Sequence, residues 1–142
     1  MAILNRLAQI AVRPFPRMIS QNGHAIFDYV NLGVFLLAAG VFWPRNKRAS
    51  IAALIAGGAA FATDLLTDYS GGLVRVIPFS VHRDIDFGLA AMTAAMPGFL
   101  VFQDEHEKKF FVAEGALISA VSQLTQAEPA RGKGRRERVK AA

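Results

Sequence analysis

Two copies of a histidine followed four residues later by an aspartate could do chemistry in this chain. The first copy is His24 with Asp28, and the second is His82 with Asp86. Residues four apart lie on the same face of an α-helix, so each pair presents an imidazole and a carboxylate together. These groups bind divalent zinc, iron, manganese or nickel, and helical bundles hold such ions between facing helices. The pairs therefore predict a metal site, provided that the helices carrying them face each other.

Two further aspartates lie between the two pairs in the sequence and are also four residues apart. Asp64 and Asp68 follow a long apolar run, which we expect to form a helix antiparallel to the first one. In that arrangement Asp64 lies level with Asp28, and Asp68 lies level with His24. The fourth expected helix offers uncharged Ser122 and Gln126 at the matching positions. The candidate ligands of a divalent transition metal are therefore His24, Asp28, Asp64, Asp68, His82 and Asp86.

Long apolar segments must position these residues. Ranges 29–44, 49–63 and 87–102 contain no charged side chain, and 110–126 contains only Glu114. Together with the first turn of each pair, each segment reaches or approaches the roughly 20 helical residues that cross about 30 Å of hydrocarbon. A soluble helix would instead carry charges every three or four residues along its solvated face. We predict an all-α membrane protein with four transmembrane helices.

The basic residues predict the orientation of these helices. An even number of crossings places both termini and the central loop on one side, which then holds all but five of the 16 Lys and Arg residues. By the positive-inside rule, both termini are cytoplasmic. We therefore expect a multi-pass protein of the cell inner (plasma) membrane. The arginines near the start of the chain leave an organelle inner membrane open as an alternative.

Three segments follow from this pattern. Residues 1–21 are mildly amphipathic and are interrupted by Pro14 and Pro16, which is typical of an interfacial segment. Residues 22–126 form the four-helix transmembrane domain. Residues 127–142 form a basic tail, which we expect to be disordered and attracted to anionic lipid headgroups. The tail lacks interleaved aromatic residues, so the expected partner is the lipid bilayer and no nucleic acid.

The sequence also matches itself after a shift of 58 residues. The matched positions include His24 and His82, Asp28 and Asp86, Gly57 and Gly115, and ranges 66–68 and 124–126. This match predicts a duplicated helical hairpin, with repeat 1 at about 22–70 and repeat 2 at about 80–126. Two helices separate the copies, so the copies point in the same direction through the membrane. The two histidines would then face each other across the bundle.

Four segments in the first two thirds of the chain resemble a known family. Residues 23–29 (GHAIFDY), 66–69 (LTDY), 72–78 (GLVRVIP) and 81–86 (VHRDID) are similar to bacterial integral membrane proteins of the SPW-repeat type. The resemblance covers about residues 22–102. It implies a small multi-helix prokaryotic membrane protein of unassigned biochemical function, without catalytic residues. The Ser-Pro-Trp tripeptide itself is absent, and its nearest counterparts are at 42–44 and 96–98.

The sequence leaves three functions open. In the first, which we take as the default, the role is structural or accessory: the aspartates offset helix dipoles, and His to Asp68 bonds tie the helix ends together. In the second, the paired motifs bind a divalent transition metal, or less favourably a haem with both histidines as axial ligands. In the third, the ionisable groups move protons or other ions across the membrane.

Other sequence features narrow the class of protein. Phosphate-binding glycine loops and nucleophile motifs are absent in recognisable form, so enzyme activity has no positive support. The chain has no cysteine, which excludes disulfides and thiol chemistry. Trp43 and Tyr69 lie near opposite ends of the apolar runs, as interfacial anchors do. The small residues fit packing within one bundle, a homo-oligomer or a larger membrane complex equally well.

Overall fold

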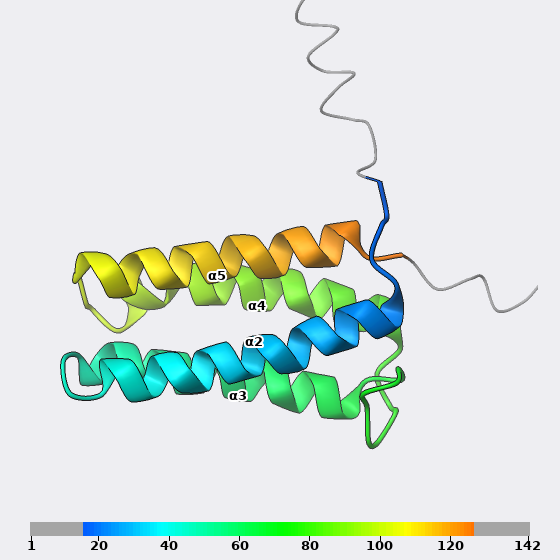
Figure 1. Ribbon diagram of the computed structural model, residues 1–142, viewed down its shortest axis with the longest axis horizontal. Coiled ribbons are helices and arrows are strands. Elements are labelled where there is room, and N and C mark those ends of the chain that lie inside the picture. The colour runs from blue at the N-terminus through cyan, green and yellow to red at the C-terminus, as the bar shows by residue number, and fades with distance from the viewer. Residues whose placement is uncertain (1–15, 127–142) are drawn as a thin grey trace, which may run out of the picture.

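Four helices make up the part of the chain that the computed structural model describes, residues 16–126. They are α2 (Gln21–Phe42), α3 (Lys47–Leu66), α4 (Phe79–Phe99) and α5 (Glu105–Leu124). The helices pack side by side with successive helices antiparallel, and both ends of the described segment lie at the same end of the bundle (Figure 1). The predicted all-α class with four helices is confirmed. The basic tail and most of the predicted interfacial segment lie outside the described residues.

Polar side chains define where the first two helices begin. The hydroxyl of Ser20 accepts a hydrogen bond from the backbone N–H of Gly23 at 3.1 Å. The side chain of Asn46 accepts one from Ala49 N–H at 3.0 Å. Each bond satisfies an N–H that has no partner within the first turn of its helix. The start of α2 matters most here, because it places His24 in the first turn.

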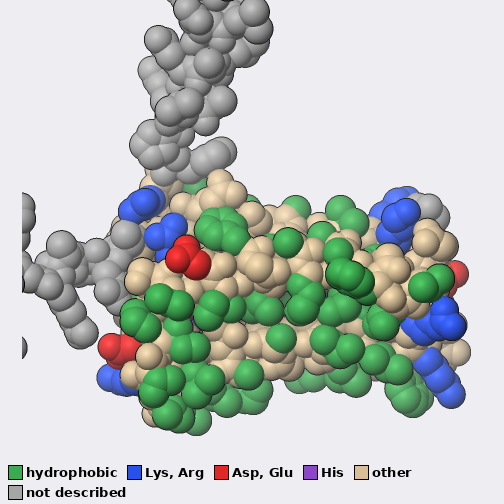
Figure 2. All heavy atoms as spheres, turned by 180° about the vertical axis from the view of Figure 1, so that it is seen from behind, with side chains coloured by type: hydrophobic (Ala, Val, Ile, Leu, Met, Phe, Trp, Pro, Cys, Tyr) green, Lys and Arg blue, Asp and Glu red, His purple; other side chains and the backbone are tan. Residues whose placement is uncertain are grey.

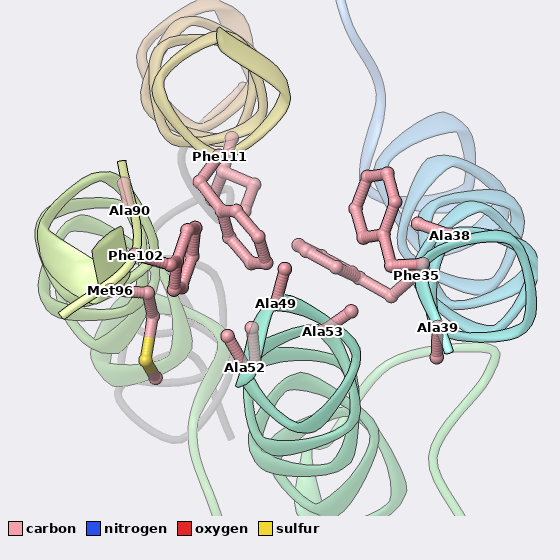
Figure 3. Close-up of a cluster of buried hydrophobic side chains, with 13 residues drawn as sticks. Phe35, Ala38, Ala39, Ala49, Ala52, Ala53, Ala90, Met96, Phe102 and Phe111 are labelled. Carbon is pink, nitrogen blue, oxygen red and sulfur yellow. The ribbon is translucent and has the colours of Figure 1, made fainter. Parts of the chain in front are cut away.

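The hydrophobic core fills the middle of the bundle and the end away from the histidines. It consists largely of phenylalanines and alanines, among them Phe35 and Phe111, which point inward from α2 and α5 (Figure 3). Gly57 allows α3 to approach α2, since a Cβ at this position would lie 2.9 Å from the Cβ of Phe35. Gly115 does the same between α5 and α4, where a Cβ would lie 2.6 Å from the carbonyl oxygen of Ala90. Close helix contacts thus rest on glycines 58 positions apart.

The outer surface of the bundle is apolar between its two ends. Large side chains such as Leu37, Val41, Leu54 and Phe99 point outward and are exposed. Figure 2 shows the charged side chains gathered at the two ends of this face, with hydrophobic side chains between them. Both α2 and α3 are long and apolar enough to cross a membrane.

Two backbone connections close the end of the bundle that holds the histidines. Ile77 N–H donates to Leu66 O at 2.8 Å, and Ile77 O accepts from Asp68 N–H at 2.8 Å. The second connection has the same pattern: Ile19 N–H donates to Leu124 O at 3.0 Å, and its carbonyl accepts from Gln126 N–H at 2.8 Å. Every residue of the first connection is 58 positions from its counterpart in the second, an offset that also separates His24 from His82.

Candidate metal centre

The two predicted histidines meet inside the bundle. His24 comes from the first turn of α2 and His82 from the first turn of α4, two helices that begin at the same end of the molecule. Their Nε2 atoms lie 3.2 Å apart, and the side chains are only 1% and 0% exposed. The expectation that the two motifs face each other therefore holds, and the distance is short enough for both nitrogens to contact the same ion.

The two predicted carboxylates complete the cluster. Asp86 Oδ2 lies 3.0 Å from His24 Nε2 and 3.4 Å from His82 Nε2. Asp28 Oδ2 lies 3.5 Å from each of the same nitrogens. One oxygen of each carboxylate thus lies within 3.5 Å of both Nε2 atoms. His24, His82 and Asp86 form a group that can hold a metal ion.

A threonine fixes the protonation of the first imidazole. His24 Nδ1 lies 2.7 Å from the Oγ1 of Thr125. The Thr125 hydroxyl already donates its single hydrogen to the carbonyl of Val121 at 2.7 Å. It can therefore only accept from His24, so the imidazole carries its hydrogen on Nδ1. In the neutral ring this leaves a lone pair on Nε2, directed at the cluster.

The second imidazole has the same arrangement in the other half of the chain. His82 Nδ1 lies 2.9 Å from Thr67 Oγ1, and that hydroxyl donates to Thr63 O at 2.7 Å. The neutral ring of His82 therefore also carries its hydrogen on Nδ1 and turns a lone pair inward. Metal-binding histidines are typically oriented by this kind of hydrogen bond from the remote ring nitrogen.

The distances that involve the two imidazole nitrogens match those between ligands of one metal ion. Ligands bound at about 2.0 to 2.1 Å around a tetrahedral ion lie roughly 3.3 to 3.4 Å from one another. The distances from the imidazole nitrogens to each other and to the two carboxylates run from 3.0 to 3.5 Å. A haem fits poorly, because axial nitrogens on opposite sides of one iron must be about 4 Å apart.

Hydroxyl groups hold both carboxylates in place. Ser122 Oγ donates to Asp86 Oδ2 at 2.7 Å, and the phenol of Tyr69 donates to Asp28 Oδ2 at 3.2 Å. Burial raises the pKa of Tyr69, and the negative charges of Asp64 and Asp28 raise it further. The phenol therefore keeps its proton and remains a donor. A hydrogen bond from a neighbouring hydroxyl fixes the direction in which a carboxylate presents its oxygen.

Aromatic rings cover the end of the cluster. Phe79 stacks on the ring of His82, with centroids 5.7 Å apart and planes 13° apart, and its edge contacts His24. Tyr69 packs against both Phe79 and His82. Together with Ala25 these rings form a small buried hydrophobic cluster. The low polarity of this cover strengthens electrostatic interactions inside the site.

Of the two remaining predicted ligands, Asp64 lies beside the cluster and Asp68 does not belong to it. Asp64 is 2% exposed, and its carboxylate lies with Asp28 and His82 in a second group whose ligand atoms are all within 4.8 Å. Asp68 belongs to neither group of potential ligands found in residues 16–126. We expected Asp68 on the helix beside His24, but α3 ends at Leu66 and the backbone becomes extended at Thr67. Thr67 therefore contacts a histidine in its place, namely His82.

Three contributors were not predicted as members of the site. Thr67 and Thr125 hydrogen-bond the imidazoles, and the sequence did carry a signal for them, because both lie in segments matched by the 58-residue shift. Tyr69 was expected to be an interfacial anchor but is only 5% exposed and faces Asp28. An aromatic residue at a helix end gives no sequence signal that separates these two roles.

Comparison with known proteins adds no family to this picture. No family model, curated protein or solved structure matches the chain. The resemblance to SPW-repeat proteins therefore stays a prediction based on four sequence segments. Evidence for the function comes from the geometry of the site itself.

Proposed function

We propose that this chain is a multi-pass membrane protein that binds a divalent transition-metal ion between His24, His82, Asp28 and Asp86. One observation carries the proposal: both Nδ1 hydrogens are used by threonine hydroxyls whose own hydrogens are already donated. The two Nε2 lone pairs and two carboxylate oxygens therefore point at one another. With both rings neutral, such an arrangement is repulsive unless a cation lies between these atoms, and burial makes the repulsion stronger.

The apolar exterior supports a membrane location. The four helices have 20 to 22 residues each, which corresponds to about 30 Å of helix, the thickness of the hydrocarbon layer. Large apolar side chains of all four helices are exposed between the charged ends of the bundle. In this proposal all four helices span the membrane, and the positive-inside rule places the metal centre near the cytoplasmic surface.

Coordination by four protein groups gives the ion a structural or accessory role. Closed shells of four protein ligands are typical of structural metals, whereas catalytic metals keep an open position. Here the ion would join the first turns of α2 and α4, which come from different halves of the chain. The matching contacts in the two halves also support the predicted hairpin duplication, with the ion at the point where the repeats meet.

Transport across the membrane has weaker support. Glu107 and Glu114 are buried in α5, each with one carboxylate oxygen that lacks a hydrogen-bond partner among the described residues. They lie on the side of α5 that faces the other helices, together with Phe111. Neither glutamate belongs to a group of potential metal ligands found in residues 16–126, and the buried phenylalanines and alanines of the core surround Phe111 on the same helix (Figure 3). Ion movement therefore remains a prediction from the sequence.

Metal titration of the purified protein tests the proposal. The full-length chain in detergent is stripped with a chelator, dialysed against Zn²⁺ or Mn²⁺, and analysed for bound metal. We expect a stoichiometric ion in the natural sequence and in His106→Ala, a control on an exposed histidine. We expect none in His24→Ala with His82→Ala. If the natural protein binds no metal while remaining helical, the cluster is a hydrogen-bonded structural element, as the default expectation has it.

A further inference from the structure

Asp64 occupies a position that the symmetry of the site assigns to a hydroxyl. Its counterpart 58 residues later is Ser122, which donates a hydrogen bond to Asp86. A carboxylate cannot perform that role for Asp28 in the same way, and the phenol of Tyr69 supplies the hydrogen bond to Asp28 instead. Asp64 is therefore not required to orient Asp28, and its presence needs another physical reason.

The Asp64 carboxylate is buried beside the cluster with an unused oxygen. The residue is 2% exposed, and within the described part of the chain its Oδ2 has no hydrogen-bond partner. A buried polar oxygen without a partner is costly unless a cation or a donor meets it. Ligand atoms of Asp64, Asp28 and His82 lie within 4.8 Å of one another, in a group that shares His82 with the group of His24, His82 and Asp86. An ion held by Asp28 and His82 would therefore lie within reach of Asp64.

We propose that Asp64 is a fifth ligand that determines which metal the site prefers, an inference that rests on the proposed metal centre. The other four groups satisfy an ion that accepts four ligands, such as zinc. A third carboxylate adds a hard oxygen and a fifth position, which suits manganese or iron(II) better. Asp64 thus shifts the selectivity of the centre away from zinc and towards ions of higher coordination number.

The test compares two metals in the same variants. Affinities for Mn²⁺ and Zn²⁺ are measured on the chelator-stripped, full-length protein in detergent by competition with a metal-binding dye. Asp64→Ser introduces the residue that the second repeat uses at this position, and Asp64→Asn preserves the size of the side chain. Asp84→Asn serves as the control, because Asp84 is an exposed carboxylate in α4, between His82 and Asp86 in the sequence.

We expect both Asp64 variants to bind Mn²⁺ at least about tenfold more weakly, while Zn²⁺ affinity changes by less than about threefold. The control should leave both affinities unchanged. Equal weakening for the two metals, or no change for either, would overturn the role of Asp64 and leave the four-ligand centre standing. A natural protein that binds neither metal would instead remove the proposed function. The helical content of each variant shows whether that variant folds. If Asp64→Ser does not fold, the comparison of the two metals is made with Asp64→Asn.

Discussion

His24 and Thr125 are 101 residues apart in the sequence, yet His24 Nδ1 lies 2.7 Å from the Thr125 hydroxyl oxygen. The same contact recurs between His82 and Thr67 in the other half of the site. In each case a threonine at the end of one repeat fixes the imidazole at the start of the other. The site therefore depends on both halves of the chain, and neither hairpin can form it alone.

Removing both hydroxyls should weaken metal binding. Thr67→Val with Thr125→Val preserves the shape of the side chains but leaves each Nδ1 hydrogen without an acceptor. We expect metal affinity to fall by about 10- to 100-fold, as for other losses of an orienting hydrogen bond. Dye competition with Zn²⁺ provides the measurement, and Thr63→Val is the control because the Thr63 hydroxyl donates to the carbonyl of Ala59 in its own helix. Unchanged affinity in the double variant would show that the threonines do not set the imidazole tautomers.

Tyr69 should resist ionisation in the folded protein. Burial and the nearby Asp64 and Asp28 charges raise its pKa above the ordinary value of 10.0. Because the folded pKa is the higher one, the resulting stability is fully present below about pH 10 and is lost as the pH rises towards the folded pKa. In a Tyr29→Phe background, Tyr69 is the only tyrosine left.

An alkaline absorbance titration of that variant measures the effect. Tyrosinate should appear near pH 10 in denaturant and only at clearly higher pH in the folded protein. Ionisation near pH 10 in the folded state would contradict the buried position of the phenol beside the two carboxylates.

Close packing between α2 and α3 gives a prediction independent of the metal. Gly57→Ala would place a Cβ 2.9 Å from the Cβ of Phe35, an atom that cannot move without its backbone. We expect a loss of about 1 to 3 kcal/mol in the free energy of unfolding. Gly58→Ala is the matched control, because a Cβ there meets nothing within 4 Å, and it should be neutral or slightly stabilising. Equal effects at the two positions, measured by unfolding in detergent, would argue against this helix contact.

Cysteine labelling tests the membrane arrangement, since the natural chain has no cysteine. Arg45→Cys lies in the connection between α2 and α3, and Ser70→Cys lies in the connection between α3 and α4; both positions are exposed. A membrane-impermeant maleimide should label Arg45→Cys in intact bacterial cells, but Ser70→Cys only after the cells are opened. The reverse pattern would invert the orientation, and labelling of both in intact cells would exclude a membrane crossing by α3.

The sequence predicted the parts of this molecule that depend on spacing. Apolar runs of helical length predicted four helices, and the repeated His-x-x-x-Asp pattern predicted that His24 and His82 meet. The end of α3 could not be predicted, because four-residue spacing makes Asp64 and Asp68 look equally helical. In the structure the backbone connection to Ile77 begins immediately after the helix and carries Asp68 out of it. The prediction of Tyr69 as an interfacial anchor was wrong for a related reason. The fold of that connection decides whether the Tyr69 ring faces lipid or the carboxylates.

X-ray absorption spectroscopy of the metal-loaded protein tests the central claim most directly. For the natural chain loaded with a stoichiometric amount of Zn²⁺, we predict a first shell of nitrogen and oxygen atoms at about 2.0 to 2.1 Å, with outer-shell scattering from two imidazoles. The imidazole scattering should disappear in His24→Ala with His82→Ala. A natural protein that takes up no stoichiometric metal, or a double variant that keeps the imidazole signal, would contradict the assignment of this site as a metal centre.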